Sequence, residues 1–458
     1  MADEPLTVVV GAGISGLSCA YALQKTGQNV LLLEAGPRAG GVIQTVEEDG
    51  YLCELGPQSF SSTPALCALF DELGLTAQLV EAPRGAPRFV CIDEQLAPVP
   101  MSPRAFLGSK LLDWKTKFAI LTEVLRTTHP PEPDESIAAF TRRKFSEQLL
   151  DRMVGPFVSG IYAGDPERTS LRAAFPKLYQ AEKTSGSVVR GMFRSSKTTT
   201  VVANQPRRRP SLLSLRTGNE ALVLALAGKL GPALHCNHPA AGLRRIGSGF
   251  VITSKSNKGA EEIPCARIVL AAPTNISAEI LQDIAPLAGA SLQQITYAPI
   301  GVTSLGYRLD QIKLSLDGFG FLIPRSAGLR TLGLVWNSSL FPGRAPQGHV
   351  LLTGFAGGAT DPGASALSED EMATLVHREI APLLGIRGDP VMSRVTHYEC
   401  AIPQYNLGHT ALLRTAQQAI SAVPGLFVIG NYWNGPAIGA CVEHSLAVAE
   451  QVRFSYNS

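Results

Sequence analysis

The chain has 458 residues, of which 45% are hydrophobic and 17% charged, and its formal net charge is +2. This length predicts two or three domains with large cores, and the near balance of basic and acidic residues indicates no nucleic-acid partner. The eight cysteines are scattered and form no Cys-x-x-Cys sequence, so neither a zinc site nor a disulfide framework is expected, and a reduced compartment such as the cytoplasm is.

The amino-terminal segment has the pattern of a βαβ unit. An apolar strand over residues 7–10 leads into a Gly-x-Gly-x-x-Gly sequence at 11–16, a helical stretch follows, and a second apolar strand over 30–33 ends at Glu34. In such a unit the helix amino terminus offers free N–H groups and a positive dipole end to phosphates. The segment therefore predicts a dinucleotide-binding site.

Each residue of this site has a mechanical reason. Gly11 permits the tight turn, Gly13 lets the backbone approach a pyrophosphate, and Gly16 lets the helix pack closely against the strand. Glu34 is placed to accept hydrogen bonds from ribose hydroxyls and would repel a 2′-phosphate, so NADP is not expected. The neighbours expected to line the same site are Ile14, Ser15 and Ala35.

A second glycine segment follows the acid. Arg38 precedes Gly40 and Gly41, and the chain then reads Glu-Leu-Gly-Pro, which adds Gly56 and Pro57 to the expected site. The glycine pair lets the chain pass close to a cofactor, and Arg38 can meet its phosphates. This segment resembles the extended FAD signature of the flavin amine oxidase superfamily, in which the glycine pair lies along the flavin. A surface glycine turn with a solvated arginine is the alternative.

Residues 109–126 alternate basic and apolar side chains around Trp114. The pattern predicts a basic amphipathic helix that suits an anionic membrane surface; an ordinary core-facing helix is the open alternative. No apolar stretch long enough to span a bilayer occurs outside the nucleotide-binding unit, and the chain enters its first strand almost at once, so no signal peptide is expected. A peripheral contact with the inner face of the cell membrane is therefore compatible with the sequence.

The rest of the chain completes a mixed α/β and α+β protein. Segments 1–80, 215–290 and 424–458 are expected to build a discontinuous, Rossmann-like FAD-binding domain. Residues 87–194 are expected to form an inserted helical, membrane-associating domain, and the polar, proline-rich residues 195–214, with Arg207, Arg208 and Arg209, a connector. Residues 291–423 are expected to form a β-sheet substrate domain, with a helix over 368–384 capped by Ser368 and Glu371.

Four stretches together resemble one family of that superfamily, the oxygen-dependent, FAD-containing protoporphyrinogen oxidases. They are the βαβ unit through Pro57, residues 160–176, residues 402–409 and residues 430–443. The resemblance implies oxidation of protoporphyrinogen IX to protoporphyrin IX in three two-electron steps of hydride transfer to flavin N5. It also implies dioxygen as acceptor, hydrogen peroxide as product, and a place in haem biosynthesis.

The family's substrate site, matched position by position, implies roles for five residues. Arg88 would pair with a propionate, Gly160 would lie close to the porphyrinogen ring, and Leu322, Val335 and Phe355 would sandwich the macrocycle. No acid or base is required, so no catalytic side chain and no metal are expected, and His409 is interpreted as a hydrogen-bonding residue. The remaining implied cofactor contacts are Ala240 at the adenine, Ala272 at a strand end, and Gly430, Asn431, Gly439, Ala440 and Cys441 at the flavin ring.

Several points stay open. Pro436 stands where many relatives have an aliphatic residue, which leaves the geometry of its turn undecided. Coproporphyrinogen III oxidation to coproporphyrin III is an alternative, for which the extra cations would be Lys177, Lys183 and Arg190. An FAD amine oxidase and a flavin-binding assembly factor are further alternatives. Cys400 would suit covalent attachment, but non-covalent FAD is expected. A ferrochelatase is a candidate product acceptor, and the chain can be a monomer or a homodimer.

Overall fold

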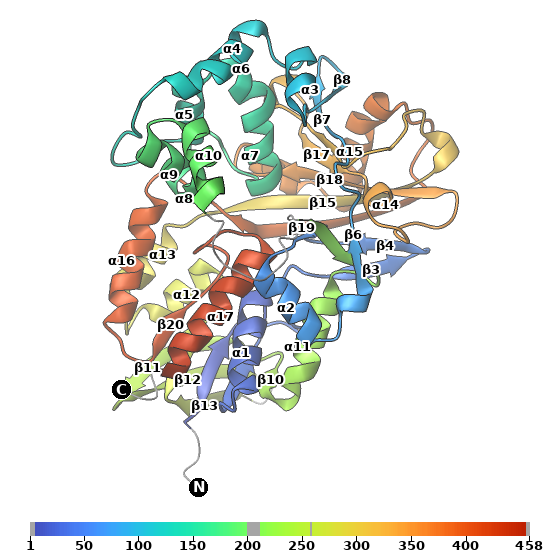
Figure 1. Ribbon diagram of the computed structural model, residues 1–458. Helices are drawn as coiled ribbons and strands as arrows, with labels where there is room; N and C mark the ends of the chain where they lie inside the picture. Colours follow the sequence, from blue (N-terminus) through green and yellow to red (C-terminus); the bar gives the residue numbers. More distant parts are fainter. Residues whose placement is uncertain (1–4, 199–210, 257–258, 455–458) are drawn as a thin grey trace.

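The computed structural model describes residues 5–198, 211–256 and 259–454, and Figure 1 shows their arrangement. At the base lies a parallel five-stranded sheet in the order β10-β2-β1-β14-β20. Its members come from segments far apart in the chain: β1 (Thr7–Val10), β2 (Val30–Leu33), β10 (Leu234–His235), β14 (Arg267–Leu270) and β20 (Leu426–Val428). The predicted Rossmann-like sheet of discontinuous segments is confirmed.

Helices cover both faces of this sheet because its short apolar strands bury side chains on both sides. Val9 packs with one helical layer, and Val8 and Val10 pack with the other. The first layer consists of α1 (Ile14–Lys25), α2 (Pro64–Glu72), α11 (Glu220–Leu230) and α17 (Ile438–Phe454). The second layer consists of α12 (Thr274–Leu281), α13 (Pro286–Gln293) and α16 (His409–Ser421).

A mixed seven-stranded sheet lies above the first one in Figure 1, in the order β19-β15-β18-β17-β16-β7-β8. Its strands are β7 (Arg88–Ile92), β8 (Gln95–Pro98), β15 (Tyr297–Arg308), β16 (Gly320–Leu322), β17 (Thr331–Val335), β18 (His349–Gly357) and β19 (Met392–Pro403). α15 (Glu369–Leu384) packs Met372 and Val376 onto one face of it. The predicted capping box of Ser368 and Glu371 starts this helix.

A cluster of helices forms the top of Figure 1 and approaches the other face of the seven-stranded sheet. Its members are α3 (Pro103–Gly108), α4 (Trp114–Thr122), α5 (Ile137–Lys144), α6 (Glu147–Leu149), α7 (Gly155–Tyr162), α8 (Leu171–Ala174), α9 (Pro176–Ser185) and α10 (Val188–Thr198). Within the described residues, no helix has the length and apolarity needed to cross a bilayer.

The predicted amphipathic helix over residues 109–126 differs from the structure. α4 begins only at Trp114, and a 3₁₀ turn follows at Glu123–Leu125. Lys117 is buried, and its Nζ donates to two backbone carbonyls of the 107–109 segment at 2.8 and 2.6 Å. The expectation of a solvent-facing charge is wrong for this lysine because its ammonium group binds the carbonyls of the preceding segment.

The remaining strands form three smaller sheets, β3-β4, β5-β9-β6 and β11-β12-β13, and a short helix is the last element. They are β3 (Thr45–Glu48), β4 (Tyr51–Glu54), β5 (Phe60–Ser61), β6 (Leu79–Glu81), β9 (Leu212–Leu215), β11 (Ala240–Ile246), β12 (Gly249–Ser256), β13 (Gly259–Cys265) and α14 (Asn337–Leu340).

Elements at three places in the chain pack differently from what the predicted domain limits imply. Strands β7 and β8 lie within the predicted helical stretch 87–194 but pair with the seven-stranded sheet. α16 lies within the predicted stretch 291–423 but packs under the five-stranded sheet. α10 and β9 extend into the predicted connector 195–214, and its arginine triplet lies outside the described residues. The domain division stays a prediction.

Candidate functional site

A cleft of about 450 Å³ opens at the carboxyl ends of the strands of the five-stranded sheet. This is the edge at which open parallel sheets bind nucleotides. Fourteen of the residues predicted from the sequence for the cofactor line it: Gly11, Gly13, Ile14, Ser15, Glu34, Ala35, Gly40, Gly41, Pro57, Ala240, Ala272, Gly430, Asn431 and Cys441. Segments from both ends and from the middle of the chain therefore meet at one site.

The glycine turn before α1 leaves room for a phosphate. Gly11 has φ +99°, a conformation that side chains disfavour, and a Cβ on Gly16 would lie 1.8 Å from the Gly11 carbonyl oxygen. Among the described residues, a Cβ on Gly13 would meet nothing within 4 Å, and no side chain caps the amino terminus of α1. The free N–H groups of this helix thus face open space, as a pyrophosphate requires.

Glu34 fixes the position of this turn. Its Oε2 accepts a hydrogen bond from the Ala12 N–H at 2.7 Å, and its Oε1 accepts one from the Gly36 N–H at 2.8 Å. Each carboxylate oxygen has a second lone pair, so the side chain can still accept hydrogen bonds from ribose hydroxyls. The arrangement fits the role predicted for Glu34.

Arg38 is not among the residues that line the cleft. Its guanidinium donates to Gly41 O at 2.6 Å, to Gln44 Oε1 at 2.9 Å and to two further carbonyls, and it pairs with Glu220 at 3.6 Å. Arg38 therefore stabilises the glycine-pair loop through hydrogen bonds to its carbonyls. Its contact with a phosphate stays a prediction.

The opposite end of the cleft is built by the turn between β20 and α17. Asn431, Tyr432, Pro436 and Ile438 line it, and the amino terminus of α17 points into it. Burial raises the pKa of the Cys441 thiol to about 11, so this cysteine is protonated at neutral pH and serves as an apolar wall.

Four other residues predicted for the cofactor support the cleft without lining it: Gly16, Gly56, Gly439 and Ala440. A Cβ on Gly56 would lie 2.0 Å from Val42 O, and one on Gly439 would lie 2.6 Å from Thr63 Cγ2, so these glycines permit close packing of the walls, as Gly16 does. Ala440 follows Gly439 in α17.

The sequence analysis missed a further group of residues that line the cleft, among them Val42, His238, Ile276, Tyr297, Ala401, Tyr432 and Ile438. Val42 follows the predicted glycine pair, and Tyr432 and Ile438 lie within the 430–443 stretch that resembles the family, so these three carried a signal, whereas His238, Ile276, Tyr297 and Ala401 carried none.

Four of the five predicted substrate residues share one face of the seven-stranded sheet. Leu322 and Phe355 both pair with Gly333, one from each side, and Arg88 and Val335 both pair with Gly320. Cross-strand partners point to the same face, and residues two apart on a strand do so as well. Arg88 precedes the other three residues by more than 230 positions in the sequence, and the sheet register brings it beside them.

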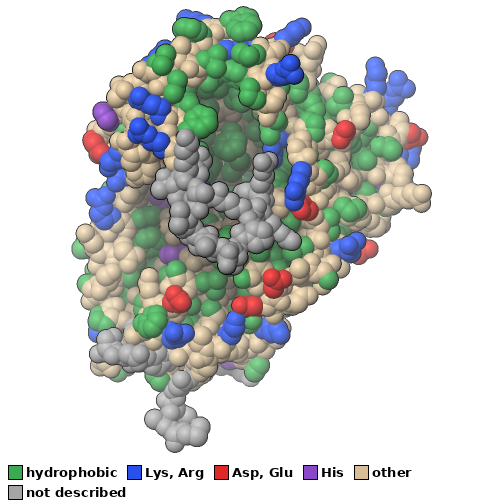
Figure 2. All heavy atoms as spheres, in the orientation of Figure 1, with side chains coloured by type: hydrophobic (Ala, Val, Ile, Leu, Met, Phe, Trp, Pro, Cys, Tyr) green, Lys and Arg blue, Asp and Glu red, His purple; other side chains and the backbone are tan. Residues whose placement is uncertain are grey.

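The fifth residue, Gly160, approaches the same face from α7. A Cβ on Gly160 would lie 2.4 Å from Leu322 Cδ2, so only a glycine allows this contact. Phe157 is exposed and lies on the same face of α7 as Gly160, three positions away, and the exposed Ile161 follows Phe157 by four positions. Figure 2 shows a hollow lined by hydrophobic side chains in the upper half of the molecule. Phe157 and Ile161 are apolar wall candidates that the sequence analysis missed.

Arg88 is exposed at the edge of this face. Its guanidinium carbon lies 5.0 Å from the centre of the Phe319 ring. No acidic side chain pairs with it among residues 5–198, 211–256 and 259–454. Lys177 and Lys183 are exposed on α9, whereas Arg190 Nη2 donates to Arg126 O and Thr127 Oγ1 inside the helical cluster.

Comparisons with known proteins agree with this geometry. The family model for flavin containing amine oxidoreductases matches residues 14–453. The chain is 35% identical to the chloroplastic protoporphyrinogen oxidase of Nicotiana tabacum, over 97% of this chain and 85% of that one. It is 26% identical to the coproporphyrinogen III oxidase of Bacillus subtilis, over 96% of each.

Solved structures share the fold. A protein from Exiguobacterium sp. 255-15 superposes with a TM-score of 0.83 at 24% identity, over the whole of both chains. Cyclohexylamine oxidase from Brevibacterium oxydans superposes with a TM-score of 0.70 at 18% identity, over 98% of this chain and all of that one. With this cleft and these relatives, the chain belongs to the flavin containing amine oxidoreductase family, and within it to the protoporphyrinogen oxidases.

Proposed function

We propose that this FAD-dependent oxidoreductase converts protoporphyrinogen IX to protoporphyrin IX in three two-electron steps, with dioxygen as the final acceptor and hydrogen peroxide as the product. The observation that carries the proposal is the sheet face on which Leu322, Val335 and Phe355 lie beside Arg88, opposite Gly160. Porphyrinogen is a broad apolar disc with carboxylate arms, and this face combines apolar walls with a cation free of acidic partners among the described residues.

A bound flavin would supply the redox chemistry, as the acceptor of a hydride from a meso carbon of the ring. The residues of the chain bind and orient the substrate. Leu322 and Phe355 contact the ring faces, and the missing side chains at Gly333 and Gly160 let Leu322 pack closely against β17 and α7. Arg88 binds a propionate through a charge-assisted hydrogen bond and so fixes the ring in its plane. Proximity and exclusion of water account for the protein's share of the catalysis.

The first test is anaerobic mixing of the flavin-loaded enzyme with protoporphyrinogen, followed by the loss of the oxidised flavin absorbance. We expect Arg88→Ala to raise KM about 10- to 100-fold with a smaller change in kcat, because it removes a hydrogen bond to a charged group remote from the reacting carbon. Arg84→Ala, which removes an exposed arginine paired with Glu81 in the preceding segment, is the matched control and should leave KM unchanged. Equal KM values for Arg88→Ala and the wild type would refute the assigned role.

The same assay separates the substrates. A higher kcat/KM with coproporphyrinogen III than with protoporphyrinogen IX would replace the proposed substrate with the tetracarboxylate. Flavin that is not bleached by either porphyrinogen would refute porphyrinogen oxidation. Oxidation of primary amines at comparable rates would favour the amine oxidase alternative.

We also propose that the helical cluster binds an anionic membrane surface. Trp114, Phe118, Leu121 and Leu125 are 69%, 66%, 55% and 79% exposed and follow one another at helical spacing along α4 and the next turn. The flanking basic residues Arg104, Lys110, Lys115 and Arg126 are exposed as well. An apolar stripe with basic flanks is the pattern of a helix that lies in the membrane interface.

Flotation with liposomes containing anionic lipid tests this surface. We expect the wild-type protein to float at low salt and the double variant Trp114→Ser with Phe118→Ser to float several-fold less, because it removes two interfacial anchors. Leu224→Ser, which alters a comparably exposed leucine on α11, should float like the wild type. Wild-type protein that remains at the bottom of the gradient at low salt would contradict the proposal.

A further inference from the structure

Two buried side chains form hydrogen bonds to the turn between β20 and α17, at the end of the cleft where the flavin ring is expected. Tyr405 and His409 are 3% and 2% exposed, and their ring centroids lie 4.6 Å apart. The Tyr405 hydroxyl donates to the carbonyl oxygen of Asn431, and His409 Nε2 lies 2.9 Å from the carbonyl oxygen of Tyr432. Two successive carbonyls of the turn are therefore held by one pair of side chains whose rings lie at 41° to each other, and both Asn431 and Tyr432 line the cleft.

The hydrogen bond determines the state of His409. A carbonyl oxygen can only accept, so Nε2 carries a hydrogen. Nδ1 is buried and has no hydrogen-bond partner among the described residues. Burial lowers the pKa of His409, although the hydrogen bond to Tyr432 opposes that effect. His409 is thus a neutral donor at physiological pH, which suits a positioning role better than proton transfer.

The same segment is tied to the wall of the substrate face. Gln404 Nε2 donates to Tyr162 O at 2.9 Å, at the end of the helix that carries Gly160. The Ser170 N–H donates to Tyr405 O at 2.8 Å. Three segments that resemble the family at the sequence level therefore form one hydrogen-bonded unit, although 23 residues or more separate the bonded groups.

We propose that Tyr405 and His409 are positioning residues that orient the peptide groups of residues 431–433 against the flavin. In a trans peptide the N–H lies antiparallel to the C=O, so holding the two oxygens sets the direction of the Tyr432 and Trp433 N–H groups. The Trp433 N–H donates to Gly430 O at 3.3 Å and so closes the turn. Preorganised peptide dipoles beside a cofactor change its affinity and its electronic properties. The inference deepens the flavin half of the proposed function and is independent of which substrate the enzyme oxidises.

The test uses the full-length protein, as flavin-loaded enzyme and as apoprotein titrated with FAD. The variants are Tyr405→Phe, which removes only the hydroxyl, His409→Met, which removes the donor, and His409→Gln, which keeps an N–H donor. The matched control is Tyr307→Phe, because the buried Tyr307 hydroxyl bonds His377 Nδ1 at 2.9 Å on the side of the seven-stranded sheet that α15 covers. The readouts are the visible spectrum of the bound flavin, the FAD dissociation constant and the thermal midpoint.

We expect Tyr405→Phe and His409→Met each to displace the visible absorption band and to weaken FAD binding about tenfold, the effect of one lost buried hydrogen bond. His409→Gln should restore both properties. Tyr307→Phe should lower the thermal midpoint and leave spectrum and affinity unchanged.

Wild-type spectra and FAD affinities in both Tyr405→Phe and His409→Met, with only a lower thermal midpoint, would overturn the inference. So would a His409→Gln protein as impaired as His409→Met. Should His409→Met fail to fold, Tyr405→Phe carries the test alone. A protein with the expected flavin changes that does not oxidise porphyrinogen would refute the proposed substrate and leave this inference standing.

Discussion

Glu54 and Arg344 form an ion pair between β4 and the segment after α14, with 2.9 Å between Oε1 and Nη1 and both side chains 2% exposed. Glu54 also accepts hydrogen bonds from Thr45 Oγ1 at 2.7 Å and from the Asn219 N–H at 2.9 Å. Burial raises the pKa of Glu54, and Arg344 opposes that effect. Glu54, in the Glu-Leu-Gly-Pro stretch predicted as part of the FAD signature, therefore links Thr45, just after the glycine-pair loop, to Arg344, just before β18 of the seven-stranded sheet.

We expect Arg344→Met to destabilise the protein by about 3 to 5 kcal/mol at pH 8, because it leaves a buried carboxylate without its cation. The loss should be smaller at pH 5. Without the cation, the pKa of Glu54 in the folded state rises further above its value in the unfolded state. Protonation of Glu54 then favours the folded form, and this contribution to stability disappears as pH rises. Urea unfolding at the two pH values measures it. The double variant with Glu54→Gln should regain most of the stability, and an equal loss in the double and single variants would contradict the explanation.

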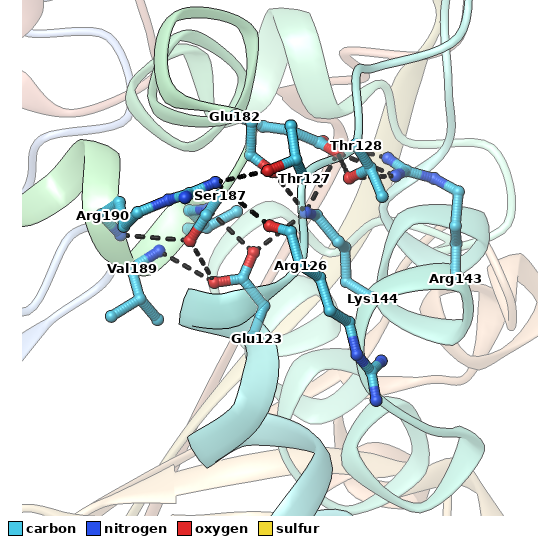
Figure 3. Close-up of polar contacts among 12 residues, drawn as sticks. Glu123, Arg126, Thr127, Thr128, Arg143, Lys144, Glu182, Ser187, Val189 and Arg190 are labelled. Atoms are coloured by element: carbon cyan, nitrogen blue, oxygen red, sulfur yellow. Dashed lines mark hydrogen bonds and ion pairs between the residues drawn. The ribbon is translucent and has the colours of Figure 1, made fainter.

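At the scale of elements, a buried carboxylate joins α10 to the end of α4. Figure 3 shows Glu123 pointing at the start of α10, where its oxygens accept the Val188 and Val189 N–H groups at 2.9 and 3.1 Å and the Ser187 hydroxyl at 2.7 Å. Lys144 Nζ lies 2.9 Å from the same carboxylate. Burial by itself raises the pKa of Glu123, but these hydrogen bonds hold it below its usual range.

A second acid completes this centre. Glu182 pairs with Lys144 at 3.2 Å and with Arg143 at 2.8 Å, and Arg143 also bonds Glu135 at 2.7 Å. Figure 3 shows the Arg143 guanidinium and the Lys144 ammonium group both directed at the Glu182 carboxylate. A helical cluster with a small apolar core thus depends on buried, mutually neutralised charges for its arrangement.

We expect Glu123→Gln to reduce hydrogen-exchange protection of the Val188 and Val189 amides at least tenfold at pH 7, because it removes the charge that caps α10 and pairs with Lys144. In the wild type the lowered pKa of Glu123 stabilises the fold above its unfolded pKa, and this stability is lost as pH falls through the folded value. Protection in the wild type should therefore decrease in acid. Glu147→Gln, which alters an exposed partner of Arg142, is the control and should leave these amides protected.

At the scale of the whole molecule, the sequence predicted what local patterns encode. The βαβ unit, the capping box of α15 and the strand-turn-helix at the carboxyl end depend on hydrophobic period and on capping residues that lie within a few positions of one another. Among the fourteen cofactor residues, those of the first glycine turn followed because glycines and strand ends mark one edge of a parallel sheet, whereas Ala240, Gly430, Asn431 and Cys441 followed from the resemblance to the family. The resemblance to the family supplied the substrate residues, which no periodicity indicates.

What the sequence did not predict depends on contacts between distant segments. The burial of Lys117, the pairing of β7 with β16 and the bonds from Tyr405 and His409 to the turn after β20 join groups that only the folded chain brings together. The helix predicted over residues 109–126 was also longer than α4, which spans Trp114–Thr122. Its first apolar pair, Leu111 and Leu112, is buried before α4 begins.

The bare backbone at Gly333 has a practical consequence. A Cβ there would lie 2.7 Å from Phe321 O and 3.0 Å from Leu322 Cδ2, so the strand cannot accept a side chain without shifting its neighbour. The spacing between Leu322 and Phe355 is consequently a fixed dimension of the main chain. An engineer who wants this enzyme to admit a larger or smaller ring should change the two flanking side chains and leave the strand between them untouched.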